Sequence, residues 1–234
     1  MNRIYLSSFI IDNLHLDVSE DILLKFEKYE SLLKEWNEKF NLTAIIDDEG
    51  ILEKHFIDSI YPIKYINFKN KSLCDIGSGA GFPGLPLAIL IPSLKVTLVE
   101  SNGKKVSFLK ELVNQLSLDN VGVIKARAEE LKDKKGTFDC VSARAVTQLN
   151  VLNELAIPLL KVKGKLLAYK LYDVEEELAN AKHALKELDS EVIDIFKYQL
   201  PISNDGRSLV VISKETATKK RYPREYSQIS KSPL

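Results

Sequence analysis

Cysteine is scarce in this 234-residue chain, which contains two, and long apolar runs are lacking as well. Cys74 and Cys140 cannot form the disulfide framework of a secreted domain, so we expect two reduced, buried thiols in a cytoplasmic protein. The longest apolar stretch, Leu85 to Pro92, is far shorter than the roughly 18 residues that span a bilayer. Near the N-terminus, Asp12 and Asp17 interrupt any signal-peptide core. We therefore expect no membrane association.

An excess of charge of one sign is also absent, since 33 basic side chains balance 33 acidic ones. Apolar residues make up 45% and charged residues 28% of the chain, which excludes intrinsic disorder as a description of the whole. A basic face can be balanced elsewhere, so zero net charge does not exclude a nucleic-acid partner. The length suits a single α/β unit with a sizeable core.

The first 68 residues have a helical pattern. Between Ile22 and Phe40 the apolar residues recur at spacings of 4, 3, 4, 3 and 4, which predicts an amphipathic helix. A second helix is expected over residues 48–61, where Pro62 ends it. We interpret residues 1–68 as an N-terminal helical cap.

Residues 69–214 alternate between strand-like and helical segments. This alternation predicts an α/β fold with a mostly parallel, doubly wound, Rossmann-like sheet. A turn-like segment at 203–206 joins the last two strands, which predicts an antiparallel edge hairpin. The expected strands are Ser72–Ile76, Val96–Val99, Val121–Lys125, Phe138–Ala143, Lys165–Leu171, Val192–Leu200 and Ser208–Ser213. The expected helices cover 83–90, 106–116, 148–160 and 174–188.

A glycine-rich loop, DIGSGAGFPGLP at residues 75–86, follows the first strand. Glycine lets the backbone turn sharply and approach a ligand closely, and ligands bind beyond the carboxyl ends of such strands. Glu100 ends the second strand, where a carboxylate can accept hydrogen bonds from both ribose hydroxyls of a nucleoside. The glycines of the loop are Gly77, Gly79, Gly81 and Gly84.

The charge of the residues around the loop helps to decide which nucleoside-containing ligand binds there. No Gly-Lys-Ser/Thr follows the glycines, which excludes a P-loop, whereas their spacing leaves a dinucleotide open. We expect Asp75 at the mouth of the loop, where its carboxylate would repel a pyrophosphate and attract a sulfonium or ammonium group. A strand-end residue hydrogen-bonded to the local backbone is the alternative for Asp75. S-adenosylmethionine carries both cations, so it is favoured. A NAD-dependent oxidoreductase on the same fold remains the alternative.

Polar residues near other strand ends complete the candidate site. Ala128 and Glu129 follow the third strand, at the place expected for an adenine ring. Arg144 follows the fourth strand, where we expect a functional role. His55 and Asp58 lie one helical turn apart and either touch RNA or, the preferred interpretation, tie the cap to the main domain. No Cys/His cluster accompanies them, so we expect no metal.

Several basic side chains could bind phosphate. Lys104 and Lys105 open a helix, and Lys170 lies in the fifth strand. The C-terminal segment from Lys214 has six Lys/Arg against two Glu, and interleaved tyrosines could stack on unpaired bases. A solvated tail is the alternative there. The basic tail, residues 215–234, includes Arg221, Tyr222, Arg224 and Tyr226.

Taken in order, these motifs resemble the GidB (RsmG) family of small-subunit ribosomal RNA guanine-N7 methyltransferases nearly end to end. The chain departs from the family pattern at Leu171, where glycine is usual, and at residues 225–229 of the tail. The motifs that carry the resemblance are Trp36-Asn37, Phe40-Asn41-Leu42-Thr43, His55-x-x-Asp58-Ser59, residues 75–86, Glu100-Ser101, Lys104-Lys105, Ala128-Glu129-Glu130, Ser142-x-Arg144-Ala145, Tyr169-Lys170, Arg221-Tyr222-Pro223-Arg224 and Pro233-Leu234.

The resemblance implies a class I methyltransferase fold, S-adenosylmethionine as cofactor, and methylation at N7 of one guanine in 16S rRNA or the small ribosomal subunit. It also implies roles for single residues. Gly77 and Phe82 would line the methionine end together with Asp75 and Gly79, and Arg144 would border the pocket as its catalytic residue. The ribose would be held by Glu100, Ser101 and Asn102, and the adenine by Ala128 and Glu129. RNA contacts are expected from Lys104, Lys105, Lys170, Arg221 and Arg224, and the enzyme is expected to act as a monomer.

Guanine N7 carries a lone pair and no proton, so its methylation needs no general base. Holding N7 in line with the methyl donor can contribute on the order of 7–11 kcal/mol. A cytosine-C5 mechanism would need a nucleophilic cysteine, and Cys74 and Cys140 lie within expected strands. A non-catalytic RNA-binding ribosome assembly factor is the remaining alternative.

Overall fold

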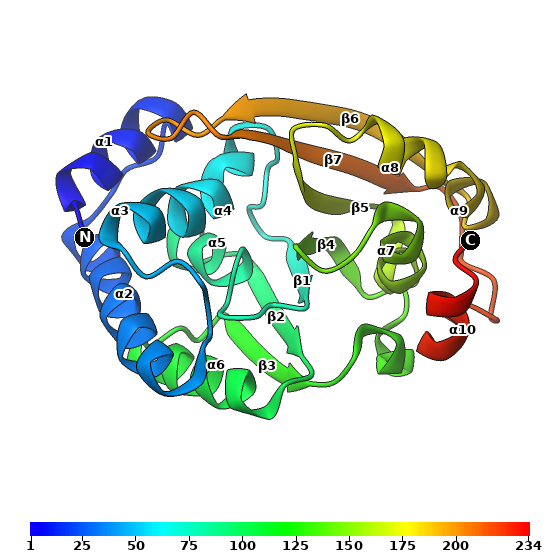
Figure 1. The fold of residues 1–234 in the computed structure, drawn as a ribbon, viewed down its shortest axis with the longest axis horizontal. Coiled ribbons are helices and arrows are strands. Elements are labelled where there is room, and N and C mark those ends of the chain that lie inside the picture. The colour runs from blue at the N-terminus through cyan, green and yellow to red at the C-terminus, as the bar shows by residue number, and fades with distance from the viewer.

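A seven-stranded sheet forms the centre of the protein in this computed structural model, which describes residues 1–234. The strand order is β3-β2-β1-β4-β5-β7-β6 (Figure 1). Strands β1 to β5 run parallel, and β7 pairs antiparallel with both β5 and β6. The parallel sheet with an antiparallel edge is therefore confirmed. The strands are β1 (Ser72–Ile76), β2 (Lys95–Glu100), β3 (Val121–Lys125), β4 (Phe138–Arg144), β5 (Leu160–Leu171), β6 (Ser190–Gln199) and β7 (Gly206–Lys214).

Helices cover both faces of the sheet, as expected for strands whose apolar runs are nearly continuous. On one face α5 (Gly84–Leu90) and α6 (Gly103–Gln115) pack with the N-terminal helices, and α7 (Leu149–Ala156) lies on the other. The expected helix over 174–188 is interrupted at Ala181, which separates α8 (Glu175–Asn180) from α9 (Lys182–Glu187). No helix is both long enough and apolar enough to cross a membrane.

The N-terminal cap consists of three helical units. Helix α2 (Glu20–Phe40) is the amphipathic helix that the spacing predicts, and Ser19 caps it by accepting from the backbone N–H of Ile22. The second unit begins as α3 (Asp48–Gly50), continues as a π-helical stretch (Ile51–Ile57) and ends as α4 (Asp58–Ile60) before a 3₁₀ turn (Tyr61–Lys64). Such π-helical insertions are frequent at functional sites. Helix α1 (Arg3–Leu14) was not expected from the sequence.

The cap and the sheet share one apolar core. Phe26 and Tyr29 of α2 belong to the same cluster of 40 buried residues as Leu85 of α5 and Leu109 of α6. At about 25 cal/mol per Å² of buried apolar surface, this packing supplies most of the force that holds the cap in place. The cap is thus fixed over the carboxyl ends of the parallel strands.

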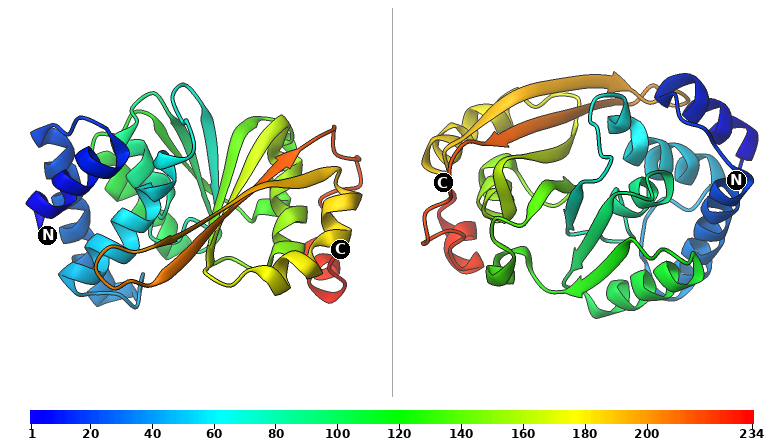
Figure 2. Two further views of the ribbon diagram at one scale, coloured as in Figure 1. Left: turned by 90° about the horizontal axis from the view of Figure 1, so that it is seen from above. Right: turned by 180° about the vertical axis from the view of Figure 1, so that it is seen from behind.

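The C-terminal tail folds back onto the other face of the sheet. Tyr222 and Ile229 are buried in a second cluster of 23 residues, together with Leu131 and Leu152. The tail ends in a short helix, α10 (Tyr226–Lys231), which lies beside α7 in both views of Figure 2. The structure therefore corrects the alternative of a solvated tail.

Candidate active site

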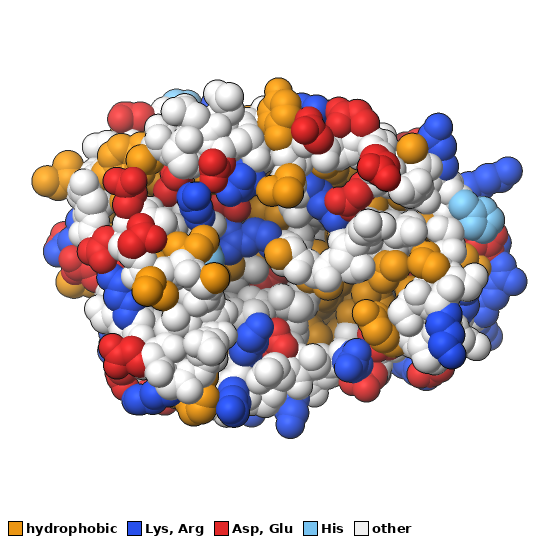
Figure 3. Space-filling view, in the orientation of Figure 1, with side chains coloured by type: hydrophobic (Ala, Val, Ile, Leu, Met, Phe, Trp, Pro, Cys, Tyr) orange, Lys and Arg blue, Asp and Glu red, His pale blue; other side chains and the backbone are white.

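A cavity of about 680 Å³ lies between the cap and the carboxyl ends of β1, β4 and β5. Figure 3 shows this face hollowed near its middle, with Lys and Arg side chains in and around the hollow. The volume falls within the range usual for small-molecule sites. The polar and charged side chains that line it are Thr43, Lys54, His55, Asp58, Ser78, Lys105, Arg144, Tyr169, Lys170, Asp173, Glu177 and Arg207.

The glycine loop forms one wall of this cavity. Gly77, Gly79 and Gly81 have φ angles of 65°, 60° and 102°, a region that glycine adopts without steric cost. A Cβ at Gly79 would meet no side chain, and its nearest neighbour would be the carbonyl oxygen of Gly77 at 3.9 Å. The backbone is therefore bare on the side where a ligand can approach.

Asp75 does not stand at the mouth of the loop, and this corrects the expectation from the sequence. Its side chain is fully buried, and its carboxylate oxygens accept from the Ser142 hydroxyl at 2.7 Å and from the Gly84 N–H at 3.2 Å. Desolvation raises the pKa of Asp75 to about 6, against the lowering effect of these hydrogen bonds. The carboxylate holds the loop in shape from behind.

Glu100 connects the second strand to the loop. Its carboxylate oxygens accept from the N–H groups of Gly79 at 3.0 Å and of Asn102 at 2.7 Å. Each oxygen keeps a second lone pair, so the group can still accept from a ribose hydroxyl. Ser101 and Asn102 are exposed beside it, and the Asn102 oxygen caps α6 by accepting from Lys104 and Lys105.

Ala128 and Glu129 lie in a 3₁₀ turn (Ala128–Glu130) after β3, outside the large cavity. Glu129 is only 6% exposed as a residue, and its carboxylate makes no hydrogen bond or ion pair within the chain. Its oxygens are not among the buried polar atoms that lack a partner, so they remain accessible from outside. They are therefore free to accept from an external donor such as an exocyclic amine.

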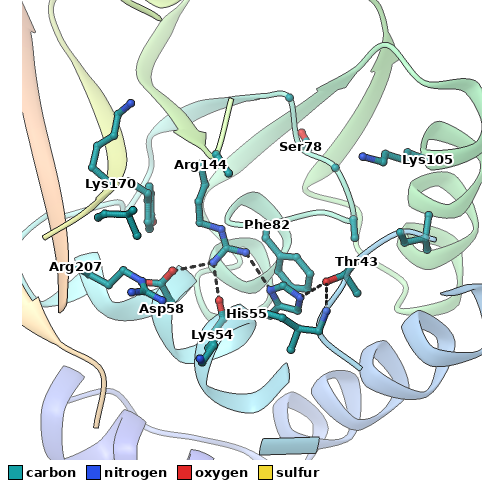
Figure 4. Close-up of a pocket in the computed structure, with 18 of the residues that line it drawn as sticks. Thr43, Lys54, His55, Asp58, Ser78, Phe82, Lys105, Arg144, Lys170 and Arg207 are labelled. Carbon is teal, nitrogen blue, oxygen red and sulfur yellow. Dashed lines mark hydrogen bonds and ion pairs between the residues drawn. The ribbon is translucent and has the colours of Figure 1, made fainter. Parts of the chain in front are cut away.

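Arg144 connects the sheet to the cap (Figure 4). Its guanidinium donates to the Lys54 carbonyl and to Asp58, each at 3.0 Å, and lies 3.4 Å from Nδ1 of His55. The preferred interpretation of His55 and Asp58, a tie between cap and main domain, is confirmed, and both also line the cavity. The Asp58 carboxylate additionally accepts from the Tyr198 hydroxyl at 2.9 Å.

The protonation of His55 follows from its neighbours. Because Arg144 can only donate, Nδ1 of His55 must accept, so Nε2 carries the proton and donates to the Thr43 hydroxyl at 2.7 Å. Burial, and then the charge of Arg144, lower the pKa of His55 to about 3. The imidazole is therefore neutral at physiological pH, with both ring nitrogens engaged.

Three stacked rings join the cap to the glycine loop. The Phe82 ring stacks on Tyr29 with centroids 5.2 Å apart and on His55 with centroids 4.4 Å apart. The Arg144 guanidinium lies 5.2 Å from the Phe82 centroid, a cation–π contact. The Tyr29 hydroxyl donates to the carbonyl of Ala80 at 2.7 Å. The Phe82 ring is thus fixed mainly by contacts with Tyr29, His55 and Arg144.

The cations expected to bind RNA lie in different surroundings. Lys105 lines the cavity and has no ion-pair partner, whereas Lys170 donates to the Thr147 carbonyl and to Glu177. Lys104 is exposed, with its ammonium 5.1 Å from the Phe40 ring centroid. Of these, Lys105 and Lys170 are brought to the cavity.

Arg221 and Arg224 are not brought to the cavity. Arg221 forms an ion pair with Glu187, and Arg224 is paired with the buried Glu154. Both guanidinium groups therefore already have carboxylate partners, on the face of the sheet that α7 covers.

Seven polar or charged residues of the cavity lining were not proposed as site residues from the sequence: Thr43, Lys54, Ser78, Tyr169, Asp173, Glu177 and Arg207. Arg207 makes one hydrogen bond, to the carbonyl of Gly206, while its Nε lies 3.9 Å from Asp58. No spacing in the sequence indicates that the start of β7, the strand between β5 and the edge strand β6, reaches this cavity. Arg207 reaches the cavity only through the way the chain folds.

The protein has neither a reactive thiol nor a cluster of metal-binding side chains. Both thiols are buried, which raises the pKa of Cys74 strongly and that of Cys140 to about 11. The chain has no group of three or more His, Cys, Asp or Glu side chains that could hold a metal ion.

The sheet and its flanking helices have the Rossmann-like fold of S-adenosylmethionine-dependent methyltransferases. Solved structures share this fold, including M. jannaschii TYW2 in complex with AdoMet, at a TM-score of 0.57 and 19% identity over 73% of this chain and 77% of that one. A SAM-dependent methyltransferase from Aquifex aeolicus has a TM-score of 0.54 at 16% identity, over 71% of this chain and 94% of that one.

Comparison with known sequences identifies the family within this fold class. The family model described as GidB, rRNA small subunit methyltransferase G, matches residues 22–203. Proteins named ribosomal RNA small subunit methyltransferase G are 44% identical in Exiguobacterium sibiricum, over 94% of each chain, and 42% identical in Clostridium perfringens, over 95% of each. The chain belongs to this family of rRNA methyltransferases.

The residues present fit S-adenosylmethionine. The bare backbone at Gly79 leaves room for close approach, and the spare lone pairs of Glu100 suit ribose hydroxyls. The residues that the sequence predicts to bind the cofactor divide into two groups: Gly77, Gly79, Phe82 and Arg144 line the cavity, whereas Glu100, Ser101, Asn102, Ala128 and Glu129 continue along the strand ends outside it.

Proposed function

We propose that this rRNA methyltransferase modifies N7 of a guanine in 16S rRNA of the small ribosomal subunit. The observation that carries the proposal is that the two groups beside Arg144 that could act as a general base, His55 and Asp58, are both already engaged. His55 is neutral with both nitrogens engaged, and the Asp58 oxygens accept from Arg144 and Tyr198. A methyl-accepting atom that must lose a proton would need a base to remove it. Guanine N7 carries no proton and needs no base.

S-adenosylmethionine, when bound, supplies a methyl group on a positively charged sulfur. The glycine loop and Glu100 are placed to hold its methionine and ribose parts. Arg144 retains donors beyond those used by Lys54, Asp58 and His55. Guanine O6 is an acceptor on the same base edge as N7, so a hydrogen bond from Arg144 to O6 would orient N7 toward the methyl group. Asp58 balances the guanidinium charge while positive charge develops on the purine.

The substrate is inferred to be locally unpaired. N7 lies in the deep, narrow major groove of A-form RNA, which side chains cannot enter. Lys105 and Arg207 lie on opposite sides of the view in Figure 4, with Arg144 and Phe82 between them. This arrangement suits a single extruded nucleotide flanked by phosphates. We propose that the enzyme acts in the cytoplasm, where ribosomal RNA is found, and that it acts as a monomer.

The test mixes the protein with labelled S-adenosylmethionine and small subunits that lack the modification, and then maps the label. We expect label at N7 of one guanine in 16S rRNA. Label at another atom would overturn the N7 assignment. RNA binding without any transfer of label would instead support a non-catalytic assembly factor.

A further inference from the structure

The C-terminal tail, residues 215–234, packs against the segment that follows β3. We call this segment, residues 126–135, the adenine-side turn, because it carries Ala128 and Glu129. Figure 1 and the rear view in Figure 2 both show α10 beside it, although some 90 residues separate the two in sequence. The two segments share one apolar cluster, to which Leu131 contributes from the turn and Tyr222 and Ile229 from the tail.

Polar contacts join the two segments at several points. The Arg127 guanidinium lies 5.3 Å from the Tyr226 ring centroid, and Lys132 forms an ion pair with Glu225 at 3.1 Å. At the far end of the turn, the Lys135 ammonium donates to the carbonyl of Tyr222 at 2.5 Å. The tail thus contacts the turn before, within and after its two short 3₁₀ segments (128–130 and 132–134).

Three of the five basic side chains of the tail are paired with carboxylates of the main domain, whereas Lys220 and Lys231 have no ion-pair partner. Lys219 and Arg221 both pair with Glu187, and Arg224 pairs with the fully buried Glu154. None of these side chains lines the large cavity.

The adenine-side turn has few hydrogen bonds of its own. Its two 3₁₀ segments are closed by the bonds from the Glu130, Leu131 and Lys134 N–H groups to the carbonyls three residues earlier, and 3₁₀ hydrogen bonds have poorer geometry than those of an α-helix. A ligand that must order its own binding loop loses affinity, whereas a loop that is already ordered does not incur that cost.

We propose that the tail braces the adenine-side turn and thereby raises the affinity for the adenosine part of S-adenosylmethionine, while making no direct contribution to RNA binding. The inference rests on the cofactor assignment in the proposed function. It assigns Glu225 and Tyr226 as positioning residues that act through Lys132 and Arg127.

The test uses the full chain with Glu225→Gln and Tyr226→Ala combined, since both side chains are exposed and their loss leaves the buried anchors in place. Lys231→Ala is the matched control, because Lys231 lies on the same helix and has no partner on the turn. Isothermal titration measures Kd for S-adenosylmethionine and, separately, for adenosine. A cation–π contact and an exposed ion pair together predict a roughly three- to tenfold rise in both Kd values.

A merely structural role would lower the melting temperature without changing the adenosine Kd of the folded protein, and that result would refute the brace. A rise in KM for small subunits at saturating cofactor, with cofactor Kd unchanged, would also refute it, because the tail would then bind RNA. If the wild-type protein bound neither compound, the cofactor assignment itself would fail, independently of the tail.

Discussion

The Arg224 guanidinium forms a two-point ion pair with the Glu154 carboxylate, which is completely buried. The N–H···O distances are 2.8 and 2.6 Å, and the backbone N–H of Arg224 donates to the same carboxylate at 2.9 Å. From sequence this arginine was expected to contact RNA. Its geometry instead makes it the anchor that fastens the tail to α7.

Replacing Arg224 by alanine should therefore destabilise the fold. Breaking a buried pair leaves an uncompensated charge, which costs about 3–5 kcal/mol. Urea unfolding checks this, with Lys219→Ala as control, since its pair with Glu187 is exposed and worth less than about 1 kcal/mol. A variant of wild-type stability that had lost RNA affinity would restore the RNA-binding interpretation.

Substituting alanine at Gly79 should reduce cofactor binding more than stability. The positive φ costs about 1–2 kcal/mol for an alanine, yet the new Cβ would meet no side chain of the protein. It would project toward the ligand, so we expect the Kd for S-adenosylmethionine to rise at least tenfold. Gly136→Ala is the matched control, because Gly136 also has a positive φ, of 65°, and its Cβ would meet nothing within 4 Å. Equal, small effects of both substitutions would show that no ligand approaches Gly79.

Glu100→Ala should weaken cofactor binding sharply while the fold persists. Hydrogen bonds to a charged group are worth about 1.5–3 kcal/mol each, and the substitution removes the ribose acceptors together with the bond to the Gly79 N–H. Calorimetric titration should show at least a tenfold loss of affinity. Glu176→Ala, an exposed carboxylate without a partner, should show none. Near-wild-type affinity of the Glu100 variant would mean that the ribose lies elsewhere.

Much of the sheet could be predicted because buried parallel strands have distinct apolar runs. The bounds of β1 and β3 agree with the prediction to the residue. Strand β5 begins five residues earlier than expected, at Leu160, because the intervening Lys161 and Lys163 are exposed and resemble a loop. Helix α1 escaped notice because its apolar residues are spread around the helix, and Ile4 and Ile11 remain exposed.

The candidate site could be predicted only where one short segment defines it. The glycine loop and Glu100 are local features, and the structure brings them together through the Gly79 N–H. Whether Asp75 faces the ligand or the core depends on Ser142, 67 residues away, and no pattern in the sequence reports that contact. For the same reason Arg207, at the start of β7, could not be assigned to the cavity.

The pKa of His55 gives a signed dependence of stability on pH. The unfolded chain binds a proton at an imidazole pKa of 6.5, but the folded state does so only near 3, mainly because the ring is buried. Stability is thus fully present above pH 6.5 and is lost as the pH falls from there toward 3. His55→Gln keeps a donor for Thr43 and an acceptor for Arg144 while removing this titration. Between pH 7.5 and pH 5, the wild-type protein should lose about 2 kcal/mol of unfolding free energy relative to the variant. Urea unfolding at both pH values measures the difference, with His183→Gln as the exposed control. A difference between wild type and His55→Gln that stayed constant across this range would mean that His55 titrates in the folded protein as it does in water.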